Sequence, residues 1–251
     1  MYHNDTDEKL QQLCTSNSEL NNLMKQYEED NKLLLSQITH EIRNPLTLIY
    51  STLQLIEHKN PDITQINYWA NLKEDMKDVF SLLDRLSEYN HCDASEMKPT
   101  DLNALLTELI SSFQTYLPEK KATLTMSIEE QATPYITSYI CDSTRMKQVF
   151  TNLLKNAMEA VDHCGTVTIE SALSEDKTNL LFKITNTGST VSEEDQDNIF
   201  LPFVTTKSTG SGLGLPTVKR ILLSHNGSIA ISSKENKTTF TVTLPIKEDN
   251  K

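Results

Sequence analysis

One histidine stands where it could take part in chemistry. His40 lies in the stretch SQITHEIRNPL, two residues from both Ile38 and Ile42, which belong to the apolar stripe of a predicted helix. At about 100° per residue, two steps turn a side chain roughly 200° from that stripe, so His40 is predicted to face solvent. Glu41 could hydrogen-bond one imidazole nitrogen and leave the other nucleophilic. The alternative is a surface histidine without a function.

Two neighbours distinguish this histidine from an ordinary surface residue. Asn44 follows His40 by one helical turn and lies on the same predicted face. Pro45 lacks the amide that would bond to the Glu41 carbonyl, so the helix is predicted to bend just after His40. A bend beside an exposed histidine would give a second domain room to approach.

A second candidate site lies on a predicted helix over residues 142–162, for which Asp142 or Ser143 is a plausible N-cap. Asn152 and Asn156 are four positions apart, so both amides are predicted to point the same way. Neutral oxygen ligands suit a Mg²⁺ ion whose other ligands are phosphates and water. The alternative is a polar helix face.

Glycine placement is the most specific compositional signal. The chain has 6 glycines, and Gly188, Gly210, Gly212 and Gly214 lie close together. The last three lead into a predicted helix, whose N-terminal amides favour phosphate. A flexible loop with a glycine cap is the alternative. A dinucleotide-binding motif would need a preceding strand and an acidic residue roughly 20 positions later. Here a polar loop precedes the glycines and Lys234 occupies that later position, so this motif is excluded.

Long helices are predicted around His40. Residues 8–38 follow a heptad pattern with Asn17 and Asn31 at the a position, which is typical of a two-stranded coiled coil. A single amphipathic helix packed on its own chain is the alternative. Pro61 interrupts the helical pattern, and a second amphipathic stretch covers residues 63–89. One helical hairpin cannot bury both apolar stripes, whereas two can, so a dimeric four-helix bundle is predicted.

From about Lys98 helices and strands are interspersed, and two strands in a hairpin end the chain. This order predicts an α/β sandwich with a mixed sheet and helices on one face. The predicted helices cover residues 102–117, 143–161 and 214–225, with a polar loop over 187–212. The predicted strands cover residues 124–128, 135–141, 166–171, 180–185, 228–233 and 238–245.

Composition excludes several classes of protein. The net charge of −12 disfavours binding to nucleic acid or to anionic lipid. No stretch approaches the roughly 18 consecutive apolar residues of a membrane span, and the polar N-terminus does not resemble a signal peptide. The 4 cysteines form no CxxC pair, which fits a reducing compartment and argues against a zinc site. A cytoplasmic protein is therefore predicted.

Five ordered blocks resemble those of the sensor histidine kinases, over residues from about 30 to 246. HEIRNPL resembles their H-box, NLLKNAMEA the N-box, ITNTG the G1 box, IFLPF the F-box, and TTKSTGSGLGL the end of the lid and the G2 box. NLLKNAMEA and FVTTK are most similar to the group that includes the Bacillus sporulation kinases. The resemblance implies a coiled-coil linker helix at 1–35, a dimerisation and histidine-phosphotransfer hairpin at 36–97, and a catalytic ATP-binding domain at 98–251.

The resemblance also implies an activity and roles for matching positions. It implies an ATP- and Mg²⁺-dependent autokinase with His40 as phosphoacceptor and Glu41 as base. Glu41 and Asn44 match the ExxN pattern that such kinases use to dephosphorylate a receiver domain. Asn156 would ligate Mg²⁺ with Asn152 near the phosphates. The other implied nucleotide-site residues are Lys155, Asn186, Gly188, Phe203, Thr206, Lys207, Gly210, Gly212, Leu213, Gly214 and Leu215.

The implied partners follow from the same resemblance. They are a second copy of the chain, a response-regulator receiver domain whose aspartate takes the phosphoryl group, and an inhibitor or sensor protein at the helical bundle. The chain would be a cytoplasmic protein or the cytoplasmic part of a membrane-bound kinase.

The G1 box departs from the family pattern at two positions. The G1 box usually reads DxGxG, and its aspartate accepts a hydrogen bond from the adenine amino group. Here Asn186 keeps an acceptor oxygen but loses the charge, and Thr190 replaces the second glycine. One alternative is a degenerate relative that passes phosphate through His40 without using ATP. Another is an ATPase of the same fold, but such enzymes carry a water-activating glutamate where this chain has Asn152.

Overall fold

The computed structural model describes residues 18–93, 96–114, 122–205, 207 and 210–246. The chain divides into two compact units, Met1–His91 and Cys92–Lys251. They are called here the hairpin unit and the catalytic unit, and each is described by itself. Within the described residues, no helix is long and apolar enough to cross a membrane.

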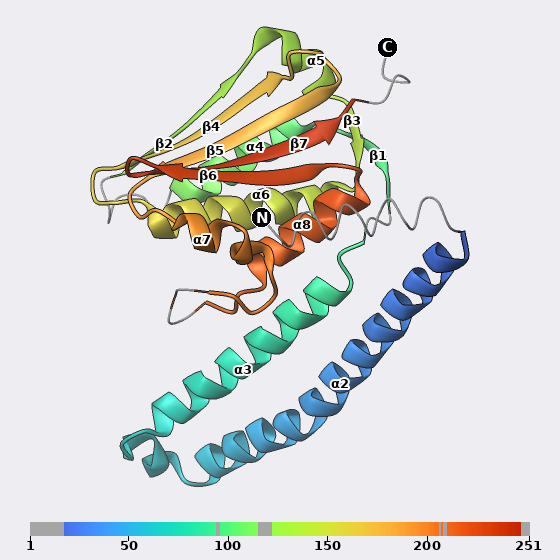
Figure 1. Cartoon of the computed structure of the whole chain (residues 1–251). Coiled ribbons are helices and arrows are strands. Elements are labelled where there is room, and N and C mark those ends of the chain that lie inside the picture. Colours follow the sequence, from blue (N-terminus) through green and yellow to red (C-terminus); the bar gives the residue numbers. More distant parts are fainter. Residues whose placement is uncertain (1–17, 94–95, 115–121, 206, 208–209, 247–251) are drawn as a thin grey trace. The chain divides into compact units, whose positions relative to one another are not determined.

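The hairpin unit consists of two helices joined by a short turn (Figure 1). Helix α2 (Ser18–Lys59) runs without a break through Pro45, and its axis changes direction between its two ends. The 3-10 helix η1 (Pro61–Gln65) follows, and α3 (Trp69–Asn90) returns along α2. The predicted break at Pro61 is confirmed, because proline suits the first position of a helix and cannot continue the preceding one.

Helix α3 packs on α2 through residues spaced by seven positions. Met76, Leu83 and Asn90 are the buried residues of α3. At the open end of the hairpin, Asn90 Nδ2 donates a hydrogen bond of 2.6 Å to the carbonyl oxygen of Lys32. This spacing agrees with an antiparallel pair of helices that share one apolar seam.

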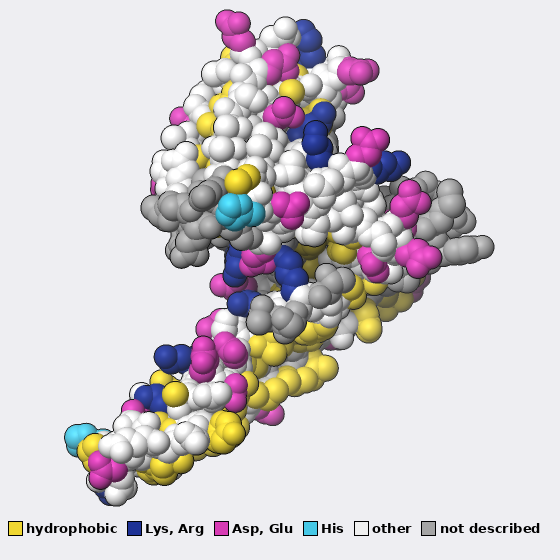
Figure 2. All heavy atoms as spheres, turned by 90° about the vertical axis from the view of Figure 1, so that its left-hand side faces the viewer, with side chains coloured by type: hydrophobic (Ala, Val, Ile, Leu, Met, Phe, Trp, Pro, Cys, Tyr) yellow, Lys and Arg dark blue, Asp and Glu magenta, His cyan; other side chains and the backbone are white. Residues whose placement is uncertain are grey.

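A second apolar stripe of the hairpin is not covered by the described residues of this unit. Ile38, Ile42 and Ile49 on α2 are 43%, 43% and 49% exposed, and Leu72 and Val79 on α3 are 42% and 38% exposed. Figure 2 shows hydrophobic side chains gathered along the helices of this unit. Because α3 covers a different face of α2, the burial of Ile38 and Ile42 between two hairpins stays a prediction.

The catalytic unit contains a mixed five-stranded sheet in the order β2-β4-β5-β7-β6. Strand β2 pairs with β4 in parallel, and the other neighbours are antiparallel. A separate antiparallel pair joins β1 to β3. The strands are β1 (Lys98–Thr100), β2 (Thr123–Ile128), β3 (Tyr139–Cys141), β4 (Thr166–Leu173), β5 (Asn179–Thr187), β6 (Ser228–Lys234) and β7 (Lys237–Pro245).

Three helices, α4 (Leu102–Gln114), α6 (Ser143–Ala160) and α8 (Gly214–Ser224), cover one face of this sheet (Figure 1). Alternate side chains of β5 point into the core they enclose, including the fully buried Phe182. The Phe182 ring packs edge-on against the Phe150 ring of α6, with 5.2 Å between centroids. The predicted helix-covered mixed sheet is confirmed.

Several predicted element boundaries need correction. The strand predicted at 135–141 is limited to Tyr139–Cys141, and 3-10 helix η2 (Glu130–Ala132) and α5 (Thr133–Ile136) precede it. Pro134 lies in the first turn of α5, where a missing amide is tolerated, whereas it could not donate to a strand ladder.

The polar loop predicted at 187–212 also contains regular structure. Two short turns lie in it, α7 (Glu193–Gln196) and η3 (Asn198–Phe200). The Ser192 side chain caps the first of them by accepting a hydrogen bond from the Asp195 amide. The helix predicted at 102–117 ends at Gln114 among the described residues, and residues 8–17 of the heptad pattern lie outside them.

Candidate functional site

His40 lies on the exposed surface of α2, as the spacing predicts, and Glu41 and Asn44 are exposed beside it. The preceding residue, Thr39, is 4% exposed, and its hydroxyl donates a hydrogen bond of 2.7 Å to the Leu35 carbonyl oxygen. Because consecutive helical residues point about 100° apart, a buried Thr39 directs His40 away from the hairpin seam. Among the described residues no hydrogen bond joins Glu41 to His40.

The second site is built on α6, whose start is fixed by a side-chain cap. The carboxylate oxygen Oδ1 of Asp142 accepts hydrogen bonds from the amides of Thr144 at 3.0 Å and Arg145 at 3.1 Å. This confirms Asp142 as the N-cap. Further along the helix, Asn152 and Asn156 are half-buried and one turn apart.

The N-terminus of α8 lies beside the first of these amides. A Cβ atom added to Gly214 would lie 3.8 Å from Asn152 Oδ1. The N-cap residue of α8, Leu213, makes no side-chain capping bond to the free amides of the first turn. Amide donors and neutral amide side chains therefore meet at one place, which suits an anionic ligand such as a phosphate chain.

Steric constraints explain why glycine is needed in the segment before α8. Gly212 has φ +65°, and a Cβ added to it would lie 2.5 Å from the backbone carbon of Phe203. The Phe203 amide donates a hydrogen bond of 3.0 Å to the Gly212 carbonyl oxygen, while the Phe203 side chain is 62% exposed. Only glycine allows the F-box and G2 segments to approach so closely.

Gly188 has a comparable role at the end of β5. Its φ is +118°, and an added Cβ would collide with the Ala160 carbonyl oxygen. Gly188 forms an isolated bridge with Val161, directly after α6. The G1 glycine thus lets β5 meet the C-terminal end of α6.

Asn186, the residue that departs from the family pattern, lies near the end of β5 and is 1% exposed. Its Nδ2 donates a hydrogen bond of 3.3 Å to the Thr187 carbonyl oxygen. Oδ1 is therefore the atom of this side chain that can accept a bond from a ligand. The local bond opposes the amide rotation that would let Asn186 donate to a guanine carbonyl.

The remaining predicted residues are spread around this site. Lys207 forms an ion pair with Glu159, which lies on α6 one turn after Asn156. Lys155 is exposed on α6, Leu213 is buried, and Leu215 is half-buried against the core. Gly210 donates an amide hydrogen bond of 3.2 Å to the Lys207 carbonyl oxygen. Thr206 lies outside the described residues.

Two further residues make fixed polar contacts with these elements. Glu159 on α6 pairs with Lys207 near the site. The buried His225, which the sequence did not single out, joins the end of α8 to the start of α6, away from the site. Among the described residues, no group of three or more histidine, cysteine, aspartate or glutamate side chains could hold a metal ion. A Mg²⁺ ion at Asn156 would therefore depend on ligand phosphates and water for its other ligands.

Comparison with known proteins agrees with this architecture. Residues 141–248 match the family described as histidine kinase-, DNA gyrase B-, and HSP90-like ATPase. Sporulation kinase D of Bacillus subtilis (strain 168) is 32% identical over 218 residues, which cover 85% of this chain and 41% of that protein. The catalytic domain of histidine kinase ThkA is 30% identical with a TM-score of 0.54, covering 60% of this chain and 98% of that one.

A structure that covers both units is also similar. Histidine kinase ThkA in complex with the response regulator TrrA matches 92% of this chain and 68% of that one, with a TM-score of 0.61. At 24% identity this likeness is one of fold. The chain spans about half the length, or less, of the curated relatives it matches.

The helix-covered mixed sheet, the amides of α6 and the glycine-led start of α8 define the catalytic unit as an ATP-binding domain of this ATPase class. The chain belongs to the histidine kinase family.

Proposed function

We propose that this chain is an ATP-dependent protein histidine autokinase of a two-component system or phosphorelay. It phosphorylates His40 and passes the phosphoryl group to an aspartate of a response-regulator receiver domain. The observation that carries the proposal is the combination of an exposed histidine on α2 with a phosphate-suited site between α6 and α8. The hairpin unit supplies the phosphoacceptor, and the catalytic unit supplies the nucleotide site.

The chemistry follows from these groups. An imidazole nitrogen of His40 attacks the γ-phosphorus, the bond to the ADP oxygen breaks, and a nitrogen–phosphorus bond forms. Glu41 takes the imidazole proton. The amides of the first turn of α8 and the side chains of Asn152 and Lys155 bind the phosphates, and Asn156 would hold a Mg²⁺ ion that neutralises their charge.

The residue at position 152 favours transfer to histidine over hydrolysis. Related ATPases activate water with a glutamate four positions before the metal-binding asparagine, and this chain has Asn152 there. A neutral amide cannot take a proton from water at neutral pH. Slow ATP hydrolysis is therefore expected.

The proposed kinase is a homodimer through the hairpin unit. The uncovered stripe of α2 and α3, with Ile38, Ile42 and Ile49 close to half-exposed, supports this part of the proposal. Two hairpins would bury each other's stripes in a four-helix bundle. Sedimentation should find a dimer at micromolar concentration, and a monomer there would contradict the proposal.

The proposed receiver docks on the face of α2 that carries His40. Leu48 and Leu55 follow His40 by eight and fifteen positions, within about 80° of it around the helix. They are 71% and 59% exposed and lie apart from the stripe proposed for the dimer. The complex of the relative ThkA with its response regulator agrees with a receiver as partner. An inhibitor or sensor protein would have the ends of the same bundle available.

We also place the kinase in the cytoplasm, either alone or as the cytoplasmic part of a membrane-bound protein. Cys92 and Cys141 are buried free thiols, which agrees with a reducing compartment.

The decisive experiment is incubation with γ-labelled ATP and Mg²⁺. Label should appear on the chain, be lost in acid and persist in alkali, as expected for a phosphorylated histidine. His40→Gln should abolish labelling, whereas His58→Gln, at the exposed end of the same helix, should not. A wild-type chain that gains label only from a phosphorylated receiver would instead support the degenerate phosphotransfer alternative.

A further inference from the structure

His225 is a buried histidine at the end of α8, far from the glycines that begin this helix. It is 2% exposed. The backbone amide of Asp142 donates a hydrogen bond of 3.1 Å to His225 Nε2. Since Nε2 accepts, the imidazole proton resides on Nδ1, which lies 2.7 Å from the Ile221 carbonyl oxygen and donates to it. His225 is thereby fixed as one neutral tautomer between two helices.

The contact joins the two helices at the end opposite the nucleotide site. Gly214, at the start of α8, lies against Asn152, and His225, just after its end, binds Asp142 at the start of α6. Eleven positions separate 214 from 225, and ten separate 142 from 152, so both helical segments measure about 15–17 Å. Helix α8 therefore runs antiparallel to the first half of α6 and is attached to it at both ends (Figure 1).

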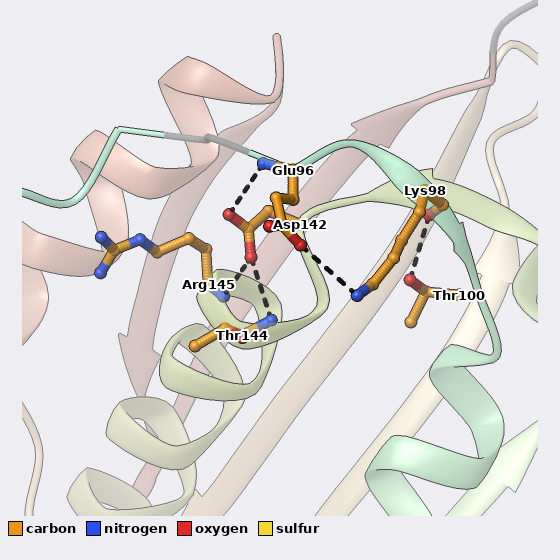
Figure 3. A network of polar contacts seen from close by, with 6 residues as sticks. All are labelled: Glu96, Lys98, Thr100, Asp142, Thr144 and Arg145. Atoms are coloured by element: carbon orange, nitrogen blue, oxygen red, sulfur yellow. Dashed lines mark hydrogen bonds and ion pairs between the residues drawn. The ribbon is translucent and has the colours of Figure 1, made fainter.

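The same junction holds the segment that enters the catalytic unit. The other carboxylate oxygen of Asp142, Oδ2, accepts a hydrogen bond of 3.4 Å from the Glu96 amide, and Figure 3 shows this bond beside the two capping bonds. On α8, Arg220 lies 3.8 Å from Asp93 as an ion pair. The residues after the hairpin unit are thus attached to α6 and to α8 near this junction.

We propose that His225 is a positioning residue for the nucleotide site, an inference that rests on the proposed binding of ATP between α6 and α8. It sets the register of α8 along α6. That register determines how the free amides of α8 stand relative to Asn152 and Asn156. Without an acceptor at position 225, the buried Asp142 amide would lose this hydrogen bond, and the pair of helices would shift in response.

The test compares two variants that each retain one of the two hydrogen-bonding functions of the imidazole. His225→Asn keeps a donor near the Nδ1 position and loses the acceptor for Asp142. His225→Gln carries an acceptor that can reach the Asp142 amide. Ser224→Ala is the matched control, because the Ser224 hydroxyl lies 3.3 Å from the same Nδ1 but outside the α6 contact. Calorimetric titration of the full chain with a non-hydrolysable ATP analogue, and the thermal midpoint, are measured for all four proteins.

The asparagine variant should bind the analogue about tenfold more weakly, equivalent to about 1.4 kcal/mol. The glutamine variant should stay within about threefold of the wild type, or roughly 0.7 kcal/mol, and the Ser224 variant should be unchanged. The inference is overturned if both His225 variants bind like the wild type, or if both lose affinity in proportion to a common loss of thermal midpoint. A wild-type chain that does not bind the analogue would overturn the proposed function itself.

Discussion

The hairpin unit and the catalytic unit bury their apolar side chains in opposite ways. In the catalytic unit, Phe150, Phe182 and Leu153 are fully buried by the chain's own sheet and helices. In the hairpin unit, large side chains such as Ile38 and Ile49 stay close to half-exposed, although they follow a regular stripe. The catalytic unit therefore completes its core within one chain, whereas the exposed stripe of the hairpin unit is where we propose that a second chain packs.

The two candidate sites also differ in how far the surrounding chain constrains their residues. His40 stands on an exposed helix face without fixed polar partners among the described residues. The positions of the proposed nucleotide site, in contrast, are constrained by neighbours, as Gly188 is by Ala160 and Asn186 by Thr187. A phosphoacceptor has to meet several partners in turn, and a nucleotide site has to hold one ligand in one geometry.

The largest expected effect is on stability, and it distinguishes the apolar core of the catalytic unit from that of the hairpin unit. Phe150→Ala should lower the free energy of unfolding of the catalytic unit by about 3–5 kcal/mol, because it removes a fully buried ring packed against Phe182. This loss should not depend on protein concentration. Ile38→Ala should destabilise the hairpin unit by an amount that grows as concentration rises through the range in which the chain dimerises, because its partner surface is proposed to come from a second chain. Denaturation followed by circular dichroism at two concentrations tests both, and a concentration-independent Ile38 effect would contradict the comparison.

Next in size is a change at the proposed metal ligand. Asn156→Asp should lower autophosphorylation about tenfold to a hundredfold, because it places a negative charge beside the phosphates. The circular dichroism spectrum and the dimer should be retained, since the hairpin unit is untouched. Asn67→Asp, the same change at an exposed hairpin position, is the control. Full activity in Asn156→Asp would remove this residue from the metal site.

A smaller effect is expected from alkaline pH in the catalytic unit. Burial raises the pKa of the Cys141 thiol from 9.0 to about 11. The folded state thus holds this proton more tightly than the unfolded state, so the stabilisation is present below about pH 9 and is lost as pH rises through 11. By pH 10.5 the loss should reach about 2 kcal/mol, because each unit of pKa shift corresponds to about 1.4 kcal/mol and the titration is not yet complete at that pH.

Burial also raises the pKa values of Cys92 and Tyr139, which act in the same direction. Urea unfolding at pH 8 and pH 10.5 should show the loss in the wild type and a smaller one in Cys141→Ala. An equal loss in both proteins would argue against Cys141 as a source.

The smallest effect concerns the base of the nucleotide. Asn186→Asp should bind ATP more tightly, by at most about tenfold, because a hydrogen bond to a charged acceptor contributes about 1.5–3 kcal/mol against about 1 for a neutral one. The gain is limited because aspartate cannot donate to the Thr187 carbonyl oxygen as Nδ2 does. ATP-over-GTP selectivity should rise while His40 stays the phosphorylated residue. Titration of both nucleotides against both proteins tests this, and weaker ATP binding would show that the site is adapted to the amide.

Local sequence was sufficient wherever the deciding interaction lies within a few residues. The exposure of His40 follows from its two-residue offset from Ile38 and Ile42, and the start of α6 follows from the capping side chain of Asp142. Helix α2 ends before Pro61 because the proline ring removes a backbone donor and cannot continue the helix. The first part of the strand predicted at 135–141 is helical instead, because Pro134 favours a first helical turn, and this preference is also local.

Contacts between distant residues were decided by the tertiary structure. The sequence by itself determined the helix that presents His40, the mixed helix-and-strand domain and the amides of α6. It contained no sign that His225 would accept a bond from Asp142, 83 positions earlier, or that Lys207 would meet Glu159, 48 positions earlier. Such pairs form because packing α8 and the adjoining loop against α6 brings them together. Periodicity and capping rules describe only a residue's own element, so they cannot identify a partner on another one.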